Sequence, residues 1–402
     1  MTFSTSGLQP RSRTEPGESR PPRGQVRLAL AGDTMLGRGV AAALLQPGGR
    51  GLFSPAVREA ARDADLFVAN LECCISEGGS PWPAPHKRFF FRAPPAAADA
   101  LAELGVHAVT LANNHALDFG ADALLETFEH LERVGIRWAG AGRDLSQARA
   151  HALLEARGFR LAIVSVTDHP ADFAAGQQRP GVAFADLHVG VPDWLLESLA
   201  AGAAAGDAVL LGAHWGPNLS LAPPRHVRAA AAALRPHVTL VAGHSAHAPH
   251  GVERAVLYDL GDFVNDYNPP RAQPTTRVGR FRSAARQQLA GIASDVARSL
   301  RAGDLGDASR TLLRAQAQRA ARLERRLRAH RLRLDLGLLF FVTLDEGRAV
   351  RLEALPLKLE YGHTRAAGRD EAGPLRRRFR SACARLGTDV RQENGRMVVE
   401  WH

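Results

Sequence analysis

Short apolar runs alternate with amphipathic stretches along most of this chain. The apolar runs have the length of strands and are bounded by Gly, Pro, Asn or Asp, which is typical of buried β-strands. The Ala- and Leu-rich stretches between them have helical spacing. Up to about residue 266 the pattern predicts strands at 26–32, 66–71, 107–112, 137–141, 160–167, 207–214, 238–243 and 254–260. Strands separated by helices indicate an α/β domain.

The clearest helix predicted by this pattern covers residues 121–134. It follows Asp118-Phe-Gly and ends before Gly135, a residue type that favours helix C-termini. The C-terminal part returns to sheet character, with strands expected at 336–344, 349–357 and 398–401 and a helix at 373–386. We expect these elements to complete the sheets begun before residue 270.

Five of the predicted strands end in residues of the types that bind metals. In an open α/β sheet, ligands bind beside the carboxyl ends of the strands, so these side chains are candidates for one common site. The alternative is a set of unrelated turn formers and helix N-caps, which Asp and Asn also favour. The residues are Asp33; Asn70 and Glu72; Asn113, Asn114 and His115; His214; and His244 and His247.

Mixed carboxylate, amide and imidazole ligands suit divalent ions such as Mn, Fe or Zn. Two such ions about 3.5–4 Å apart activate water and hold a transferring phosphoryl group. We expect Asn114 to bind metal, while His115 stays unligated and acts as a general acid for the leaving oxygen. Asp118 is then a second catalytic candidate, because it can orient His115 from three residues away. A purely structural His115–Asp118 pair is the alternative.

The segment Ser80–Pro95 interrupts the alternation with prolines, aromatics and basic residues. Loops of this kind beside a site often contact substrate. Lys87, Arg88 and Arg92 are therefore candidate ligands for an anionic substrate, and Lys87 and Lys358 are the only two lysines of the chain. The alternative is a surface loop that packs on its own Phe and Trp side chains.

The positive charge of the chain is concentrated in one segment. The formal net charge is +10, and residues 271–333 hold 16 Arg, no Lys and 4 acidic residues, so the rest carries about −2. Leu and Ala recur there at helical spacing with Arg between them, which predicts helices. The segment is a candidate for binding a protein partner, a phosphopolymer or an anionic membrane surface, or is a solvated insertion. Nucleic acid is disfavoured because aromatics for base stacking are absent.

The composition places further bounds on the protein. Residues 1–24 are rich in Pro, Gly, Ser and Arg, which predicts a disordered tail, and they contain no apolar core of a secretory signal. No apolar run reaches the length of a transmembrane helix. Three cysteines, two of them adjacent, do not form a disulfide framework. We therefore expect a cytoplasmic protein, with peripheral attachment to a membrane as the alternative.

The ordered motifs of this chain resemble those of the CapA family, the poly-gamma-glutamate capsule-synthesis proteins. The motifs are GDTML, NLE, NNHALDFG, AGAGRD, HWG, GHSAH and YDLGDFVNDY. The resemblance covers about residues 26–270 and resumes at 336–402. It implies an α/β fold related to calcineurin-like metallophosphoesterases, a four-layer α/β/β/α sandwich with its site at one edge of two packed sheets. The implied divisions are a tail at 1–24, a CapA-like domain at 25–270, an Arg-rich helical insertion at 271–334 and completing elements at 335–402.

The resemblance also assigns roles to individual residues. The implied metal ligands, matched motif by motif, are Asp33, Glu72, Asn114, His214, His244 and His247, with His115 as the partner of Asn114. Met35 departs from the pattern, because metallophosphoesterases have histidine in the corresponding Asp-X-His motif. This departure leaves open whether one or two metals bind. The basic segment at 271–333 is not part of the family pattern.

We therefore expect a CapA-type, metal-dependent hydrolase that resembles phosphoesterases and acts in the metabolism of capsule, poly-gamma-glutamate or another envelope polymer. A non-catalytic role in binding or assembling an anionic polymer is the first alternative. In that case the metal site would hold carboxylates and the Arg-rich segment would hold the chain. The second alternative is binding of nucleic acid or phosphopolymer through residues 271–333 alone.

Overall fold

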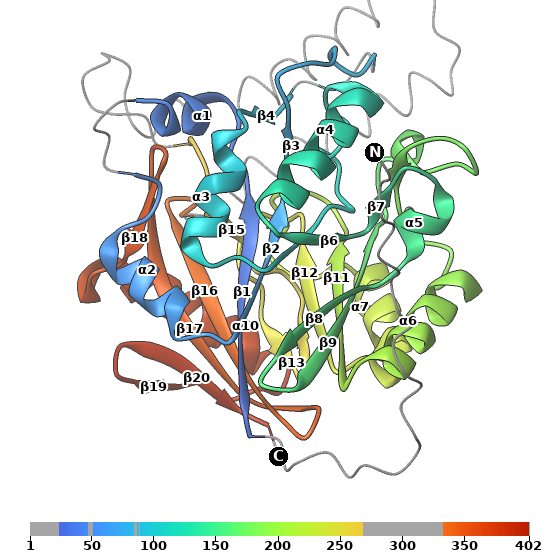
Figure 1. Cartoon of the computed structure of the whole chain (residues 1–402). Helices are drawn as coiled ribbons and strands as arrows, with labels where there is room; N and C mark the ends of the chain where they lie inside the picture. The colour runs from blue at the N-terminus through green and yellow to red at the C-terminus, as the bar shows by residue number, and fades with distance from the viewer. Residues whose placement is uncertain (1–23, 47–50, 84–86, 88, 268–332, 402) are drawn as a thin grey trace, which may run out of the picture.

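The computed structural model describes residues 24–46, 51–83, 87, 89–267 and 333–401. Within these residues the chain forms two large sheets with helices on both outer sides (Figure 1). The predicted basic segment at 271–333 and the predicted tail at 1–24 lie almost entirely outside the described residues. The α/β class expected from the sequence is confirmed.

The larger sheet has ten strands and is centred on β1. Its order is β19-β20-β17-β16-β1-β2-β5-β6, while β15 pairs with β1 and β18 with β17. Strands β1, β2, β5 and β6 run parallel, so their carboxyl ends meet at one edge. The strands are β1 Val26–Thr34, β2 Leu66–Leu71, β5 Ala108–Thr110, β6 Arg137–Ala139, β15 Asp262–Val264, β16 Leu336–Asp345, β17 Arg348–Glu360, β18 His363–Ala366, β19 Arg391–Glu393 and β20 Arg396–Glu400.

The second sheet has six strands in the order β13-β14-β12-β11-β9-β8. Strands β9, β11, β12 and β14 are parallel, so this sheet also collects its carboxyl ends at one edge. These strands are β8 Ala152–Ala156, β9 Phe159–Thr167, β11 Ala208–His214, β12 Leu240–His244, β13 Val252–Glu253 and β14 Val256–Leu257. Two short ribbons pair β3 Cys74–Ile75 with β4 Arg92–Ala93, and β7 Ala141–Gly142 with β10 Gly181–Val182.

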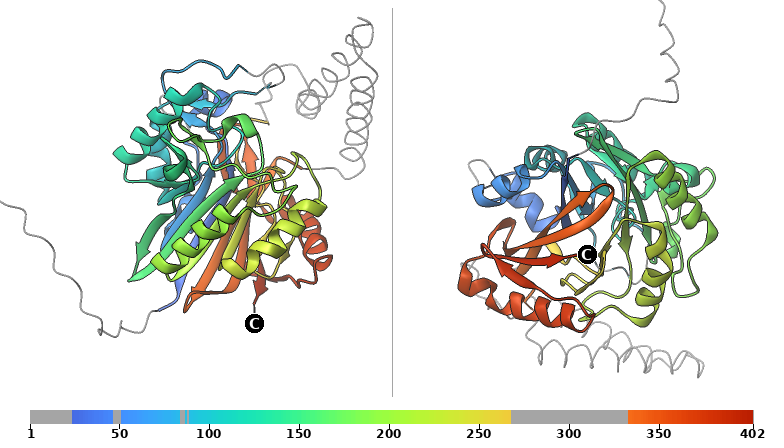
Figure 2. Two further views of the ribbon diagram at one scale, coloured as in Figure 1. Left: turned by 90° about the vertical axis from the view of Figure 1, so that its right-hand side faces the viewer. Right: turned by 90° about the horizontal axis from the view of Figure 1, so that it is seen from below.

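The helices pack on the outer faces of the two sheets. Figure 2 shows the sheets edge-on with helices on either side. The α-helices are α1 Arg38–Leu44, α2 Pro55–Arg62, α3 Ala96–Leu104, α4 Gly120–Arg133, α5 Leu145–Arg149, α6 Asp193–Ala205, α7 Arg225–Leu234 and α10 Arg369–Ala384, and two 3₁₀ turns lie at Ala171–Phe173 and Arg235–His237.

Strand β1 shows how the sequence pattern produces these layers. Ala29 and Ala31 join the core formed with α1–α4, whereas Leu28 and Leu30 join the core between the two sheets. Successive side chains of a strand point to opposite faces, and a strand buried on both faces is apolar at every position. A third core lies between the six-stranded sheet and α6 and α7.

The predicted helix at 121–134 is confirmed as α4, and the strand predicted at 336–344 is confirmed as β16. Two predictions were wrong in detail. The strand predicted at 254–260 is present only as the two residues of β14, because Arg254, whose φ is +51°, lies in the turn that pairs β14 with β13 just before it. The C-terminal helix begins at Arg369 and not at 373, because Glu371 bonds back to the Gly368 backbone N–H and Pro374 lies within the helix.

The chain leaves and re-enters the larger sheet at neighbouring points. Strand β15 lies beside β1, and β16 pairs with β1 in antiparallel register. The side-chain amide of Asn265 donates to the carbonyl oxygen of Leu334 at 3.3 Å. The described residues on either side of the gap at 268–332 therefore lie beside each other, near the strand that carries Asp33.

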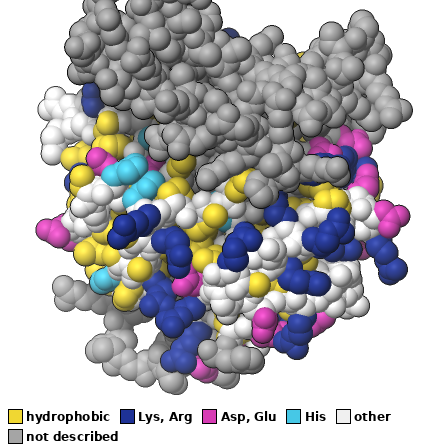
Figure 3. Space-filling view, turned by 180° about the vertical axis from the view of Figure 1, so that it is seen from behind, with side chains coloured by type: hydrophobic (Ala, Val, Ile, Leu, Met, Phe, Trp, Pro, Cys, Tyr) yellow, Lys and Arg dark blue, Asp and Glu magenta, His cyan; other side chains and the backbone are white. Residues whose placement is uncertain are grey.

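The surface of the described part has mixed charge. On the back of the molecule, Lys and Arg side chains are spread among Asp and Glu and do not form a single stripe (Figure 3). Among the described residues, every helix is too short or too polar to cross a bilayer.

Candidate functional site

Asp33 lies at the end of β1, where an irregularity aims it at the site. The pairing of β1 with β2 and with β15 shifts register around this residue. Gly32 allows the shift, because a Cβ there would lie 1.8 Å from the Gly261 carbonyl oxygen. The backbone N–H of Asp33 donates to that oxygen at 2.8 Å, and its carboxylate accepts from the Asn70 amide at 2.8 Å. Asp33 is fully buried.

Glu72 follows β2 and is also fully buried. Neither carboxylate oxygen has a hydrogen-bond partner among the described residues. Oε1 lies 3.9 Å from His115 Nε2 and 3.9 Å from His214 Nε2, and Oε2 lies 3.9 Å from His247 Nδ1. These separations are too long for hydrogen bonds. They fall within the range for two ligands of one ion at bonds of about 2.0–2.2 Å.

The six-stranded sheet delivers the other histidines. His214 ends β11 and His244 ends β12, and the two residues are register partners. Gly243 is required before His244, because a Cβ there would lie 2.1 Å from a backbone oxygen of Tyr258. The loop after β12 is strained, with φ of +101° at Ser245 and +56° at His247.

That loop brings the two sheets together. His244 Nδ1 lies 3.2 Å from Asp33 Oδ1, and His247 Nδ1 lies 3.1 Å from Asp33 Oδ2. The Ser245 backbone N–H also donates to Asp33, at 3.3 Å. The polar ends of β1 and β12, which belong to different sheets, therefore meet at one point.

His115 and Asp118 form a tight pair in the turn after β5. His115 Nδ1 lies 2.6 Å from Asp118 Oδ2, which also accepts from the Phe91 backbone N–H at 2.6 Å. Lys87 Nζ lies 2.8 Å from the other Asp118 oxygen and donates to the Asn114 carbonyl oxygen at 2.6 Å. The Asn114 side-chain oxygen is buried and has no hydrogen-bond partner in the described part of the chain.

The electrostatics of the site are those of crowded acids and bases. Burial raises the pKa of Glu72 well above its ordinary value, and the charge of Asp33 adds to this effect. Burial alone would raise the pKa of Asp33, but hydrogen bonds to His244 and His247 bring it well below the ordinary value. Burial also lowers the pKa of His115 and, more strongly, that of His214, so both imidazoles are neutral near pH 7.

His247 has the opposite shift. Burial alone would lower its pKa, but the surrounding acidic groups, Glu72 and Asp262 among them, raise it well above the ordinary value. Asp262 lies 2.9 Å from the same Nδ1 atom that faces Asp33, and burial raises the pKa of Asp262 to about 6. Several buried carboxylates thus converge on one point, where they favour positive charge.

The residues present fit a divalent metal centre. Buried charge is costly unless it is paired or coordinates a metal, and Glu72 has neither hydrogen-bond donor nor direct ion pair within 3.5 Å among the described residues. Asp33, Glu72 and His247 offer ligand atoms that all lie within 4.8 Å of one another. His214, 3.9 Å from Glu72, and His244, 3.2 Å from Asp33, bring further ligand atoms to this group. Mixed O and N donors of this kind suit borderline divalent ions.

The remaining predicted residues have different placements. Lys87 reaches the site through Asp118, whereas Arg88 lies outside the described residues. Arg92 donates to the Gly78 carbonyl oxygen at 2.9 Å and lies over the Phe119 ring, so its guanidinium already has partners elsewhere. Met35 is an apolar core residue that accepts from the Tyr267 hydroxyl at 3.2 Å. It cannot supply the missing imidazole.

The sequence did not assign roles to several residues that build the site. Asn70 bridges Asp33 and Asn113, and its side-chain oxygen accepts from Asn113 at 3.2 Å. Asp259 holds the histidine loop by accepting from the Ala246 backbone N–H at 2.7 Å. Asp262 orients His247, because it lies 2.9 Å from the Nδ1 atom. Asp259 and Asp262 both lie in the motif YDLGDFVNDY, which was a signal without an assigned chemistry.

Comparison with known proteins supports the interpretation of the sequence motifs. A protein from Mycobacterium tuberculosis named probable polyglutamine synthesis accessory protein is 33% identical over 60% of this chain and 75% of its own length. The PGA biosynthesis protein CapA of Bacillus subtilis is 25% identical over 62% of this chain and 66% of its own. The capsule biosynthesis protein CapA of Bacillus anthracis is 24% identical, covering 63% of each chain.

A solved structure of a hypothetical protein from Thermus thermophilus covers 83% of this chain and 99% of its own at 16% identity, with a TM-score of 0.41, which is too low to support an argument. The family model described as bacterial capsule synthesis protein PGA_cap matches residues 27–267, which include the six-stranded sheet, part of the larger sheet and every candidate ligand. On this match and the similarity to the named relatives, the chain belongs to the CapA family of bacterial capsule synthesis proteins.

Proposed function

We propose that this protein is a metal-dependent hydrolase, similar to phosphoesterases, that acts in the synthesis or processing of capsule or poly-gamma-glutamate. The observation that carries the proposal is Glu72, a fully buried carboxylate with three imidazole nitrogens at 3.9 Å and no hydrogen-bond donor among the described residues. The names of the relatives support the polymer context. The packing of two sheets with the site at their common edge supports the kinship with metallophosphoesterases.

In this proposal the divalent ions would be held by Asp33, Glu72 and the three histidines of the six-stranded sheet, with the Asn114 amide oxygen as a further ligand. Mn, Fe and Zn all suit such a set. When bound, they would activate water near neutral pH and polarise a phosphoryl oxygen. One ion is the minimum that the geometry supports. A second ion is part of the proposal, although Met35 takes the place of one of the histidines that the metallophosphoesterase pattern provides.

His115 is the residue that we propose handles the proton. Asp118 holds its Nδ1, so Nε2 faces Glu72 and the interior of the site. In the neutral ring the proton is on Nδ1, so Nε2 must first take up a proton, which a bound anionic substrate would favour. The imidazolium can then donate that proton from Nε2 to the leaving oxygen of a bound ester. Asp118 is itself fixed by the Phe91 backbone N–H and by Lys87, which makes it a positioning residue. Lys87 also brings the positive charge nearest to His115, where an anionic substrate would approach.

The metal and the proton donor can be tested separately. We expect purified protein to contain one to two equivalents of Mn, Fe or Zn by elemental mass spectrometry. Glu72→Gln should contain less of this metal than wild type, by the equivalents held at the Glu72 centre, whereas Glu103→Gln, on the exposed side of α3, should contain as much as wild type. His115→Asn should retain the metal but lose at least about 100-fold in turnover of nitrophenyl phosphate mono- or diesters. Wild-type protein without metal, or undiminished turnover in His115→Asn, would contradict the proposal.

A non-catalytic role is the second candidate, because the Mycobacterium tuberculosis relative is named an accessory protein. In that role the metal centre would bind carboxylates of the polymer. Polymer synthesis in cells that carry His115→Asn would then be normal, while cells that carry Glu72→Gln would lose it. The hydrolase proposal expects polymer defects in both strains.

A further inference from the structure

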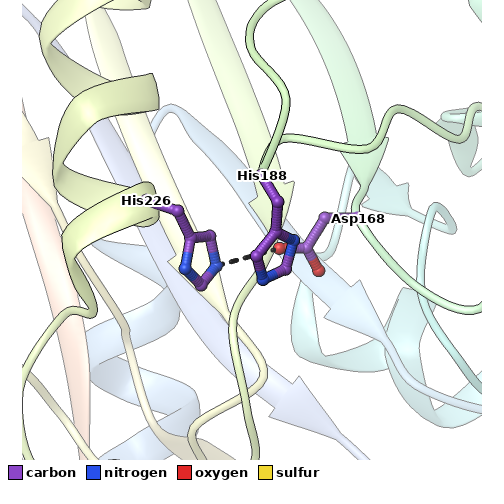
Figure 4. Close-up of side chains that lie close together, drawn as sticks. All are labelled: Asp168, His188 and His226. Carbon is purple, nitrogen blue, oxygen red and sulfur yellow. Dashed lines mark ion pairs between the residues drawn. The ribbon is translucent and has the colours of Figure 1, made fainter.

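A second group of potential metal ligands lies beside the candidate centre. Asp168 follows β9, His188 lies in the loop after β10, and His226 is in the first turn of α7 (Figure 4). Each offers one ligand atom, and these atoms all lie within 4.8 Å of one another. Side chains from three separate elements thus converge on one point. None of the roles proposed above requires this arrangement.

The separation of His226 and Asp168 fits two ligands of one ion better than it fits a hydrogen bond. His226 Nε2 lies 3.6 Å from Asp168 Oδ2. A hydrogen bond would bring these atoms to about 2.7–3.0 Å. Two ligands of a tetrahedral zinc ion, at bonds of about 2.0–2.1 Å, are about 3.4 Å apart. His226 Nε2 is also buried without a hydrogen-bond partner among the described residues, although it faces a carboxylate.

The charge around the group also suits a cation. The Asp168 carboxylate faces His226, and the carboxylate of Asp186, 3.3 Å from His188 Nδ1, adds further negative charge.

The two imidazoles are already arranged as a pair. The rings of His188 and His226 stack with centroids 3.8 Å apart and planes at 21° to each other. Asp168 is held in place, because its Oδ2, the oxygen that faces His226, accepts from the Gly216 backbone N–H at 2.9 Å and its Oδ1 contacts His169 Nδ1. A buried, anchored carboxylate and two neighbouring imidazoles form a two-His, one-carboxylate set, the ligand number of many zinc sites that keep an open position.

We propose that Asp168, His188 and His226 bind a divalent cation of the zinc class at a site separate from the Glu72 centre. The His188 side chain is 60% exposed, so the fourth position opens to solvent and can take water or an anionic group. The new site lies one strand away from His214, because the Asp168 backbone N–H donates to the His214 carbonyl oxygen at 3.2 Å. It depends on none of the residues that carry the proposed function.

The test is zinc binding by the full-length protein. We expect His188→Ala to bind one equivalent of Zn²⁺ fewer than wild type, or to bind that equivalent at least tenfold more weakly, in competition with a chromophoric chelator. His188 is exposed, so its removal should leave the far-ultraviolet circular dichroism spectrum unchanged. His237→Ala, which removes an exposed histidine after α7, is the matched control and should bind as wild type does.

A second variant separates the new site from the candidate centre. In a Glu72→Gln background, one equivalent of Zn²⁺ should remain, and adding His188→Ala should remove it. Co²⁺ in place of Zn²⁺ should give a visible absorption band that depends on His188 and His226 but not on Glu72. Equal binding by wild type and His188→Ala, or equal losses in His188→Ala and His237→Ala, would overturn the proposal. Loss of all binding in Glu72→Gln would also overturn it.

Discussion

Stability should fall in mild acid because of one buried histidine, His250. Its Nε2 lies 2.9 Å from the Ser220 carbonyl oxygen, which places the proton of the neutral ring on that nitrogen. Nδ1 is buried without a hydrogen-bond partner in the described part of the chain. Protonation would place a positive charge on this atom, in the interior and near Arg378. Burial is the main reason that the pKa of His250 is lowered to about 4.

The size of the effect follows from that pKa. Above about pH 6.5 the imidazole is neutral in both the folded and the unfolded chain, so its contribution is fully present. Between pH 6.5 and pH 4 the unfolded chain binds a proton that the folded chain does not, and the free energy of unfolding falls by about 1.4 kcal/mol per pH unit. The loss should reach about 2 kcal/mol at pH 5 and level off below pH 4.

The assay is urea unfolding of chelator-treated protein between pH 7.5 and pH 5, for wild type and for His250→Gln. The glutamine amide can still donate to Ser220 but cannot take up a proton. We expect the wild type to lose about 2 kcal/mol more than the variant over this range, while His237→Ala should lose as much as wild type. A difference between wild type and His250→Gln that stays constant from pH 7.5 to pH 5 would refute the reasoning.

Three further perturbations test the fold. Burial would raise the pKa of Asp335, but hydrogen bonds from Arg333 and Lys358 lower it to about 2. Asp335→Asn should therefore lower the free energy of unfolding by about 2 kcal/mol at pH 7. In urea titrations, the difference between wild type and variant should disappear as pH falls from 4 towards 2. Phe128→Ala, in the core under α4, should cost about 3–5 kcal/mol in the same titration. Gly243→Ala should displace the strand end and reduce bound metal in elemental analysis, since its Cβ would lie 2.1 Å from a backbone oxygen.

The candidate site could be located from the sequence because strand ends carry positional information. Asp33, Glu72 and His244 each terminate or follow an apolar run, and parallel strands bring their carboxyl ends to a shared edge. The pattern could not predict how the two sheets pack against each other. The 3.2 Å contact between His244 and Asp33 depends on that packing.

Other features had no local signal at all. Asp168, His188 and His226 come from three elements and meet only in the folded chain, so no spacing along the sequence joins them. The strand predicted at 254–260 was too long, because apolar content does not show where the turn before β14 ends or where the strand stops. Pro356 lies within β17, a position that sequence alone does not favour, since proline in a sheet is usually confined to positions that need no N–H donor.

The bond between Asn265 and Leu334 has a consequence for how this protein can change over evolutionary time. It fixes the two points between which residues 268–332 run, beside the strand that carries Asp33. The entropy of closing a chain segment grows only slowly with its length, by about 0.6 kcal/mol for each doubling. Lineages can therefore lengthen, shorten or replace this segment at little thermodynamic expense. Such changes in length leave the flanking strands and the candidate ligands of the described chain unaltered.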